Sequence, residues 1–425
     1  MDLLFSVPYL ARIVLSLFAI LIFQKLTKRL DLAMAAGIVL LALWTGHSAA
    51  SMARVAGARV ASLDMLFLAF VIAGIIWLSS LMSHAGVMKE LVVSLRSRLP
   101  KRAILAALPA VVGLLPMPAG ALFSCPLVDD ADDARELDPD LKTRINYWFR
   151  HVWEFWWPLY PGVLLAIDMS ALPIWKFTLL MFPLFFAAIA AGYVFLLRKA
   201  PAAGPAPRGE RDAPFLPLIL PILTVIAVYA LVLVFIPGVG RFNKYLPMAV
   251  GVLCSLVVMQ LQRPAPFGTW KRVVLSWKSF SLVLLIVLAR VYGAFVEARL
   301  PDGSSLMENV RAELDAYGIP AMALIVVVPF ISGITTGITV GYIGASFPVV
   351  LSLAGTDTAG LFATIVLGYA SGFVGMMLSP IHICLIVTND YFKTGMASSL
   401  YGLLRPAAML FLGAVAYSFL WRWLA

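Results

Sequence analysis

Residues 358–389 of the chain, TAGLFATIVLGYASGFVGMMLSPIHICLIVTN, contain no Asp, Glu, Lys or Arg. An α-helix needs only about 20 apolar residues to cross roughly 30 Å of hydrocarbon, so this stretch is long enough to span a bilayer. Residues 177–197 are equally free of charge. Of the 425 residues, 62% are hydrophobic and 13% are charged, which excludes an ordinary soluble protein. The sequence therefore predicts an all-α polytopic membrane protein.

Apolar segments divide the chain into two halves of six segments each. Residues 199–214, KAPAAGPAPRGERDAP, are rich in Pro, Gly and charge, a composition that suits a linker rather than a core. We expect one repeat over residues 1–198 and a second over residues 215–425. The expected apolar segments are about 4–24, 30–46, 62–83, 103–128, 146–168, 172–197, 215–236, 243–262, 277–297, 318–354, 360–388 and 397–424.

Proline spacing indicates that the two halves are related. Four prolines of the first half keep the spacing of four prolines in the second, with a single two-residue insertion. The same alignment pairs Ser124 with Ser346 and Asp168 with Asp390. Four prolines and an aspartate under one gap point to an internal duplication. The proline pairs are Pro100 and Pro320, Pro109 and Pro329, Pro126 and Pro348, and Pro158 and Pro380.

One apolar segment in each half is interrupted in its middle. Residues 316–356 lack charge over 41 positions, too many for one crossing, and Gly333, Gly337, Gly341 and Gly344 interrupt their middle. Their counterpart, residues 104–128, is broken by Pro116, Pro118 and Gly120. Irregular backbone at membrane depth requires surrounding protein or a water-filled cavity. Each repeat should therefore hold five full spans and one re-entrant hairpin, at about 103–128 and 318–354.

An odd number of spans inverts the second repeat relative to the first. With the N-terminus outside, 20 Lys and Arg residues lie in the expected cytoplasmic loops and eight lie outside. This bias is typical of inner-membrane proteins, and it explains most of the net charge of +10 without a nucleic-acid partner. We expect a multi-pass protein of the cell inner membrane with both termini outside.

An inverted repeat with paired broken segments is typical of a secondary transporter whose site lies near the midplane. Helix N-termini at the hairpin tips suit an anion, and opposite helix ends with free carbonyls suit Na⁺. For any single tip residue close helix packing is the simpler interpretation, but the paired pattern favours a site. The candidate tip residues are Pro118, Gly120, Ser124, Thr335, Thr336, Gly337, Thr339 and Ser346.

The span at about 146–168 is broken by a proline and carries ionisable groups close to the break. Such groups are costly inside a membrane and are functional candidates by default. Glu154 is the best candidate for a proton or cation carrier, and Tyr160 lies just past the break. Arg150 and His151 are predicted nearer the cytoplasmic end, where snorkelling or headgroup contact explains them at least as well.

The corresponding span of the second half, about 360–388, is broken at Pro380. Ser379 and His382 flank this break in a charge-free stretch, so we expect His382 to line the pathway. Asp168 and Asp390 end the two broken spans, and helix-end or loop contacts are their expected roles. The three cysteines lie inside apolar runs, where packing is their expected role.

An enzyme is the competing class of protein. His151 and Glu154 are three residues apart on a helix, a spacing that can ligate a metal, but an HExxH motif is absent and the chain has four histidines in all. A Walker A motif is also absent, so ATP-driven pumping by this chain is unsupported. A channel would differ from a carrier by its unsaturable conductance. We favour a transporter with no cofactor beyond a coupling ion, and no metal beyond Na⁺ at the hairpin tips.

Three motifs resemble those of a known family. LPMPAGALFSCPLV (115–128), NYWFRHVWEFWWPLYPGVLL (146–165) and LSPIHICLIVTNDYF (378–392) look like an uncharacterised family of prokaryotic integral membrane proteins. That family is placed in the ion transporter superfamily, alongside permeases for gluconate, lactate, citrate and dicarboxylates. The resemblance implies an elevator-type carrier, in which hairpins and broken spans move against a scaffold that often dimerises, so we expect a homodimer.

The hairpin tips depart from the pattern of these relatives. Their tips often carry a Ser-Asn-Thr signature that binds carboxylate and Na⁺, whereas this chain has PMPAG and GITTGITVG. The resemblance therefore locates the hairpin tips in this chain, but it does not assign the binding residues of the relatives to them. We predict a membrane-embedded transporter of a small organic anion, a carboxylate, coupled to Na⁺ or H⁺. The alternative is a cation/proton antiporter without an organic substrate.

Overall fold

The computed structural model describes residues 7–96, 99–116, 120–132, 135–200, 214–236, 238–355 and 357–423, apart from the side chains of Arg96, Lys101 and Lys278. Helices dominate this part of the chain, and its extended pairing is limited to an isolated bridge between Arg299 and Ser305. The helices are α2 (Tyr9–Thr27), α3 (Leu30–Trp44), α4 (Ala49–Val60), α5 (Leu63–His84), α6 (Val87–Arg96), α7 (Lys101–Gly113), α8 (Gly120–Asp130), α9 (Pro139–Arg150), α10 (Pro161–Met169), α11 (Ile174–Phe195), the short 3₁₀-helix η1 (Leu197–Lys199), α12 (Phe215–Phe235), α13 (Val239–Phe242), α14 (Leu246–Gln262), α15 (Phe267–Val274), α16 (Trp277–Glu297), α17 (Leu306–Ala316), α18 (Ala321–Thr336), α19 (Thr339–Ser352), α20 (Thr358–Met377), α21 (Ile383–Phe392) and α22 (Met396–Trp423).

Seven helices in the described part of the chain are long and apolar enough to cross a membrane, and an eighth span results if the bent pair α17–α18 counts as one. The prediction of an all-α, multi-pass membrane protein is confirmed. Fewer long helices are found than the ten full spans expected, because α3 and α14 are shorter apolar helices and residues 146–168 are divided between α9 and α10. The seven spans are Tyr9–Thr27, Leu63–His84, Ile174–Lys199, Phe215–Phe235, Phe267–Glu297, Thr358–Met377 and Met396–Trp423. The third of these spans joins α11 to η1, and the fifth joins α15 to α16.

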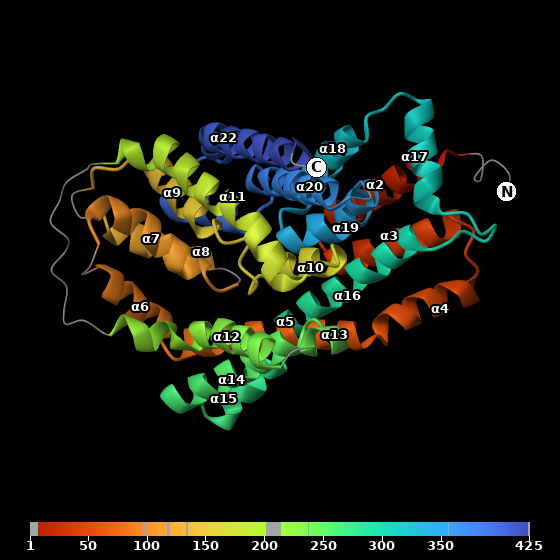
Figure 1. The fold of residues 1–425 in the computed structure, drawn as a ribbon. Coiled ribbons are helices and arrows are strands. Elements are labelled where there is room, and N and C mark those ends of the chain that lie inside the picture. Colours follow the sequence, from red (N-terminus) through yellow and green to blue (C-terminus); the bar gives the residue numbers. More distant parts are fainter. Residues whose placement is uncertain are drawn as a thin grey trace.

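The helices form two groups on either side of α16 (Figure 1). On one side α12 packs against α14, and α14 packs against α5. On the other side α18 and α22 both pack against α20. Between these groups, α16 contacts α3, α4, α5 and α19. Large apolar side chains on the outer faces, such as Phe235, Leu261 and Leu412, are exposed, as expected for a surface in contact with lipid.

A glycine creates the turn between α18 and α19. Gly337 adopts a left-handed conformation with φ of +64°, which a residue with a side chain adopts only with strain, and its N–H caps the Gly333 carbonyl at 2.9 Å. The next residue, Ile338, is extended, and α19 begins at Thr339. A Cβ atom on Gly337 would also lie 3.2 Å from the backbone nitrogen of His382, so the turn packs closely against the α20–α21 connection.

Prolines lie in two further interruptions. Residues 151–160 separate α9 from α10 and include Pro158, while residues 378–382 separate α20 from α21 and include Pro380. Proline lacks a backbone N–H, and it disfavours helical geometry in the residue before it. Both interruptions therefore end one helix and allow another to start at a new angle. The start of α10 is buried, whereas α21 starts at a buried His382 between the exposed Ile381 and Ile383.

The acidic helix α17 lies across the end of the molecule and meets α18 at an angle of 113°. Its apolar face, including Leu306, Val310 and Leu314, is buried. The carboxylate of Glu313 accepts hydrogen bonds from the backbone nitrogens of Tyr9 and Leu10 at 2.8 and 2.7 Å. A side chain of α17 thereby satisfies the first amides of α2, a helix whose N-cap is a proline without a capping side chain.

Candidate functional site

An open pocket of about 430 Å³ lies where the α9–α10 and α20–α21 interruptions meet the α18–α19 turn. The start of the α7–α8 connection and one residue of α16 complete its wall. The described residues that line the pocket are Pro116, Arg150, His151, Glu154, Tyr160, Pro161, Gly162, Leu282, Ile338, Thr339, Val340, Met376, His382, Ile383 and Cys384.

Three helices begin at this pocket. The N-cap residues of α10, α19 and α21 are Tyr160, Ile338 and His382, and all three line it. Among the described residues, no side chain caps any of these three N-termini. The first amides of a helix carry partial positive charge, equivalent to about half an elementary charge at the terminus. Three such termini make the pocket attractive to an anion.

Arg150 adds a full positive charge to the pocket. It is the last residue of α9 and only 5% exposed, and its guanidinium lies against Gly120, the first residue of α8. A Cβ atom on Gly120 would lie 2.2 Å from Nη1 of Arg150, so the guanidinium occupies space that a larger residue would fill. Arg150 and His151 are both buried, which corrects the interpretation of these residues as snorkelling to headgroups.

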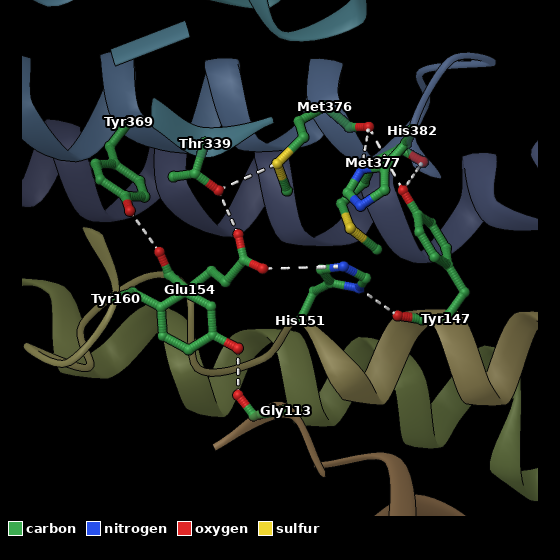
Figure 2. Close-up of polar contacts among 10 residues, drawn as sticks. All are labelled: Gly113, Tyr147, His151, Glu154, Tyr160, Thr339, Tyr369, Met376, Met377 and His382. Atoms are coloured by element: carbon green, nitrogen blue, oxygen red, sulfur yellow. Dashed lines mark hydrogen bonds and ion pairs between the residues drawn. The ribbon is translucent and has the colours of Figure 1, made fainter. Parts of the chain in front are cut away.

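Glu154 lies between the α18–α19 turn and His151 (Figure 2). Its Oε2 accepts a hydrogen bond from the hydroxyl of Thr339, and its Oε1 lies 3.8 Å from Nε2 of His151. Its backbone carbonyl accepts a hydrogen bond from the hydroxyl of Tyr369. The carboxylate is thus held from the first residue of α19, while its other oxygen faces an imidazole.

Two histidines from distant parts of the chain meet beside Glu154. The rings of His151 and His382 have centroids 4.8 Å apart and are nearly perpendicular, and the ring of Tyr147 lies within 5.1 Å of both centroids. Nδ1 of His151 lies 2.6 Å from the Tyr147 carbonyl. Because a carbonyl oxygen can only accept, Nδ1 carries the proton and Nε2 faces Glu154.

Of the residues singled out from sequence, Glu154, Tyr160, Thr339 and His382 line the pocket together. The Tyr160 hydroxyl donates to the Gly113 carbonyl, which fastens the start of α10 to the end of α7. Outside the pocket lining, Ser379 donates to the Ile334 carbonyl at 2.5 Å and ties the α20–α21 interruption to α18.

The remaining hydroxyl residues singled out from sequence lie outside the described pocket lining. Their hydroxyls donate hydrogen bonds to backbone carbonyls of their own helices, so each hydroxyl is already satisfied within its helix. Pro118 lies outside the described residues, whereas Gly120 and Gly337 provide close approaches of backbone. The residues whose hydroxyls bond within their own helix are Ser124, Thr335, Thr336 and Ser346.

A comparison with protein families matches residues 11–420 to a family described as "protein of unknown function (DUF401)". The chain belongs to the DUF401 family. The matched range contains every residue of the pocket lining named above. No curated protein matches the chain.

Sequence reasoning missed several residues of the pocket in this DUF401 family member. Cys384 was assigned to packing, yet it lies two residues after His382 in the first turn of α21 and lines the pocket. Gly162 was not considered, although a Cβ atom there would lie 2.5 Å from Cγ2 of Thr339. The His-x-Cys pattern at the start of a helix was the available signal for Cys384, whereas Gly162 is explained only by the approach of α19.

A second polar cluster fixes the far end of α10. Oδ1 of Asp168 accepts from the Tyr245 hydroxyl at 2.6 Å and lies 3.1 Å from Nζ of Lys244. Oδ2 pairs with Nε of Arg290 on α16. Asp168 therefore makes the helix-end contact expected from sequence, and it joins α10 to both α14 and α16.

A second cavity, about 380 Å³, lies between α2 and α18 and has a different chemistry. Its described lining consists of apolar side chains such as Leu17, Phe18 and Val327 together with Ser332, and includes no charged residue. Such a groove suits a hydrocarbon chain. The charged and dipolar groups, which suit a polar ligand, are gathered in the pocket around Arg150 and Glu154.

Proposed function

We propose that the protein is a secondary active transporter that moves a small organic anion, a carboxylate, across the inner membrane. The observation that carries the proposal is the convergence of three helix N-termini and the Arg150 guanidinium on one open pocket of about 430 Å³. Clefts of roughly this size hold small ligands, and a few placed polar groups set their specificity. The positive groups here outnumber the one carboxylate of the described lining, Glu154, and favour an anionic substrate.

Glu154 is the proposed carrier of the coupling ion, either H⁺ or Na⁺. Its side chain is buried, lines the proposed substrate pocket and accepts a hydrogen bond from Thr339. Binding of H⁺ or Na⁺ to the Glu154 carboxylate would therefore change the net charge of the pocket in which the substrate binds. Replacing it by glutamine keeps the size of the side chain and an acceptor oxygen. The Glu154→Gln variant should retain part of its substrate binding while losing gradient-driven accumulation.

The paired construction of the pocket supports an inverted repeat. Each half of the chain contributes one interrupted helix, α9–α10 or α20–α21, and one helix pair, α7–α8 or α18–α19. We assign the two pairs as re-entrant hairpins, and propose that they and the interrupted helices move as an elevator against the scaffold. Among the described lining residues, Leu282 of α16 lies outside the hairpins and the interrupted helices, so it would belong to the scaffold.

The proposed setting is a homodimer in the inner membrane with both termini outside. Exposed apolar side chains on α12 and α14, such as Leu220, Val234 and Val257, are available to lipid or to a second copy. Labelling of single cysteines at the two termini of a cysteine-free variant tests the orientation, since an impermeant reagent should reach both from outside. Cross-linking in the native membrane tests the dimer.

The experiment that tests the transport function is uptake of labelled carboxylates into proteoliposomes with imposed Na⁺ or pH gradients. Saturable, gradient-dependent uptake that falls at least about tenfold in Arg150→Gln supports the proposal, since about 1.4 kcal/mol of binding energy corresponds to a factor of ten. Arg241→Gln is the matched control, because Arg241 is an exposed arginine outside the pocket. Conductance that does not saturate would identify a channel instead.

A cation/proton antiporter is the second candidate function. It is favoured by one observation, the buried Glu154 carboxylate flanked by Thr339 and His151 at the centre of the pocket. An antiporter requires an essential carboxylate and no organic substrate. Cation exchange in liposomes that is abolished in Glu154→Gln, with no carboxylate uptake by the wild type, would favour this function over anion transport.

A further inference from the structure

The α9–α10 interruption and the start of α21 bring soft metal ligands together on one side of the pocket. The ligand atoms of His151, His382 and Cys384 all lie within 4.8 Å of one another. Both histidines are buried, and all three side chains line the pocket. Two imidazoles and a thiolate are ligands that Zn²⁺ and related ions prefer.

The hydrogen bonds of the two histidines leave a nitrogen on each ring for a metal. Nδ1 of His151 faces the Tyr147 carbonyl at 2.6 Å, and Nδ1 of His382 lies 3.4 Å from the Met376 carbonyl. A second-shell carbonyl of this kind fixes the tautomer of a metal-binding histidine and orients its ring. Nε2 is therefore the available ligand atom on both rings (Figure 2).

Glu154 supplies a fourth ligand on the same side. Its Oε1 lies 3.8 Å from Nε2 of His151, while Oε2 is occupied by the Thr339 hydroxyl. Around a tetrahedral Zn²⁺, with bonds of about 2.0–2.3 Å, ligand atoms lie roughly 3.3–3.8 Å apart. Side-chain movements of about 1 Å would bring the ligand atoms of His151, His382 and Cys384 to this spacing. Glu154 lies outside that three-residue group and would complete the coordination by rotation of its side chain toward it.

We propose that His151, His382, Cys384 and Glu154 bind one transition-metal ion of the zinc class, joining the α9–α10 interruption to the start of α21. The thiolate and the carboxylate offset the two charges of the ion, so the Arg150 guanidinium still gives the pocket a net positive charge. This inference concerns ion binding alone and does not depend on which substrate the pocket transports. Edge-to-face packing of the two imidazoles is the competing explanation of the cluster.

Cobalt binding tests the proposal directly. The full-length protein is purified in detergent, treated with a chelator and titrated with Co²⁺ while its absorption spectrum is recorded. The expected result is a thiolate-to-Co²⁺ charge-transfer band with the visible bands of a tetrahedral site, saturating at one ion per chain and abolished by Zn²⁺. If the wild-type protein gives no such band, the proposal is overturned.

Matched variants assign the ligands. Cys384→Ser removes the sulfur with little change in size, so the charge-transfer band should disappear, whereas Cys254→Ser on α14 should keep it. His382→Ala should weaken Co²⁺ binding at least about tenfold, as loss of a ligand contact does in other metal sites. Elution of each variant as a single folded species excludes misfolding. A charge-transfer band that persists in folded Cys384→Ser would refute this ligand set.

Discussion

Two glycines pack against Arg150, Gly120 against its side chain and Gly113 against its backbone. A side chain can move aside more easily than backbone can. A Cβ atom on Gly120 would lie 2.2 Å from the Arg150 guanidinium, the far end of a flexible side chain. A Cβ atom on Gly113 would lie 2.0 Å from the Arg150 carbonyl, which is backbone. The first contact can be relieved by moving the guanidinium, but the second requires α7 and α9 to separate. The two positions should therefore affect function and folding separately.

Gly120→Ala should displace the guanidinium from the pocket at little cost in stability. We expect carboxylate binding to weaken by at least about tenfold, with a melting temperature close to that of the wild type. Binding is measured by thermal shift and uptake. Gly57→Ala is the control, because nothing lies within 4 Å of a Cβ atom at that exposed helical position. It should leave binding intact and stabilise the helix by up to about 1 kcal/mol. Unchanged carboxylate binding in Gly120→Ala would disprove the role assigned to the contact.

Gly113→Ala should instead destabilise the folded protein. Inserting a methyl group into a packed interior commonly costs about 1–3 kcal/mol, and rigid backbone on the other side raises that cost. The measurement is the thermal or denaturant unfolding of the purified variant relative to the wild type. A variant as stable as the wild type would show that α7 and α9 approach each other less closely than described.

At the residue scale, sequence predicted part of the pocket and missed the rest for identifiable reasons. Glu154 and His382 attract notice because ionisable groups in apolar spans are rare. From sequence, an arginine near a predicted span end fits snorkelling to the headgroups as well as a place in the pocket. The structure decides for the pocket, because the Arg150 guanidinium is buried against Gly120. Thr335 and Thr336 look polar in sequence, but sequence alone does not reveal that their hydroxyls face their own helix.

At the scale of elements, the α2 N-terminus depends on a side chain some 300 positions away. Glu313 of α17 accepts from the amides of Tyr9 and Leu10, where a local cap is absent among the described residues.

The all-helical, membrane-spanning class was predictable, because charge-free runs determine it. Helix length was not, since an apolar run of constant composition can form one long helix or two short ones. The interrupted helix α9–α10 and the short helices α3 and α14 illustrate this.

Glu313→Ala should destabilise the protein by about 1 kcal/mol, the usual cost of losing an N-terminal cap, through fraying of α2. Amide hydrogen exchange should increase at the start of α2, and the melting temperature should fall. Asp315→Ala is the control, since Asp315 is an exposed acid on the same helix. Equal stabilities for the two variants would contradict the capping role.

At the scale of the whole molecule, Asp168 connects the pocket-lining helix α10 to α14 and α16. The carboxylate is 3% exposed and pairs with Lys244 and Arg290. Removing one partner of a buried ion pair is costly because the other charges remain, whereas exposed pairs contribute little. In the proposed elevator motion, any movement of α10 against α16 would have to break this cluster.

Asp168→Asn should destabilise the protein by roughly 3–5 kcal/mol, because Lys244 and Arg290 would then face each other without a carboxylate. Glu90→Gln is the control, since Glu90 forms an ion pair with Arg263 in which both side chains are well exposed. Its effect should stay below about 1 kcal/mol. Unfolding of both variants in the same detergent measures the difference. Similar losses in the two would show that the Asp168 cluster does not stabilise the assembly of α10, α14 and α16.

The most direct test of the anion pocket is thermal unfolding of purified wild type and Arg150→Gln with a panel of small carboxylates, varying Na⁺ and pH independently. We predict that a carboxylate at 100 times its Kd stabilises the wild type by about 2.7 kcal/mol, and that Arg150→Gln loses this stabilisation. A dependence of the effect on Na⁺ or pH would name the coupling ion. Equal stabilisation of both proteins, or stabilisation by Na⁺ or pH alone, would contradict anion binding at Arg150.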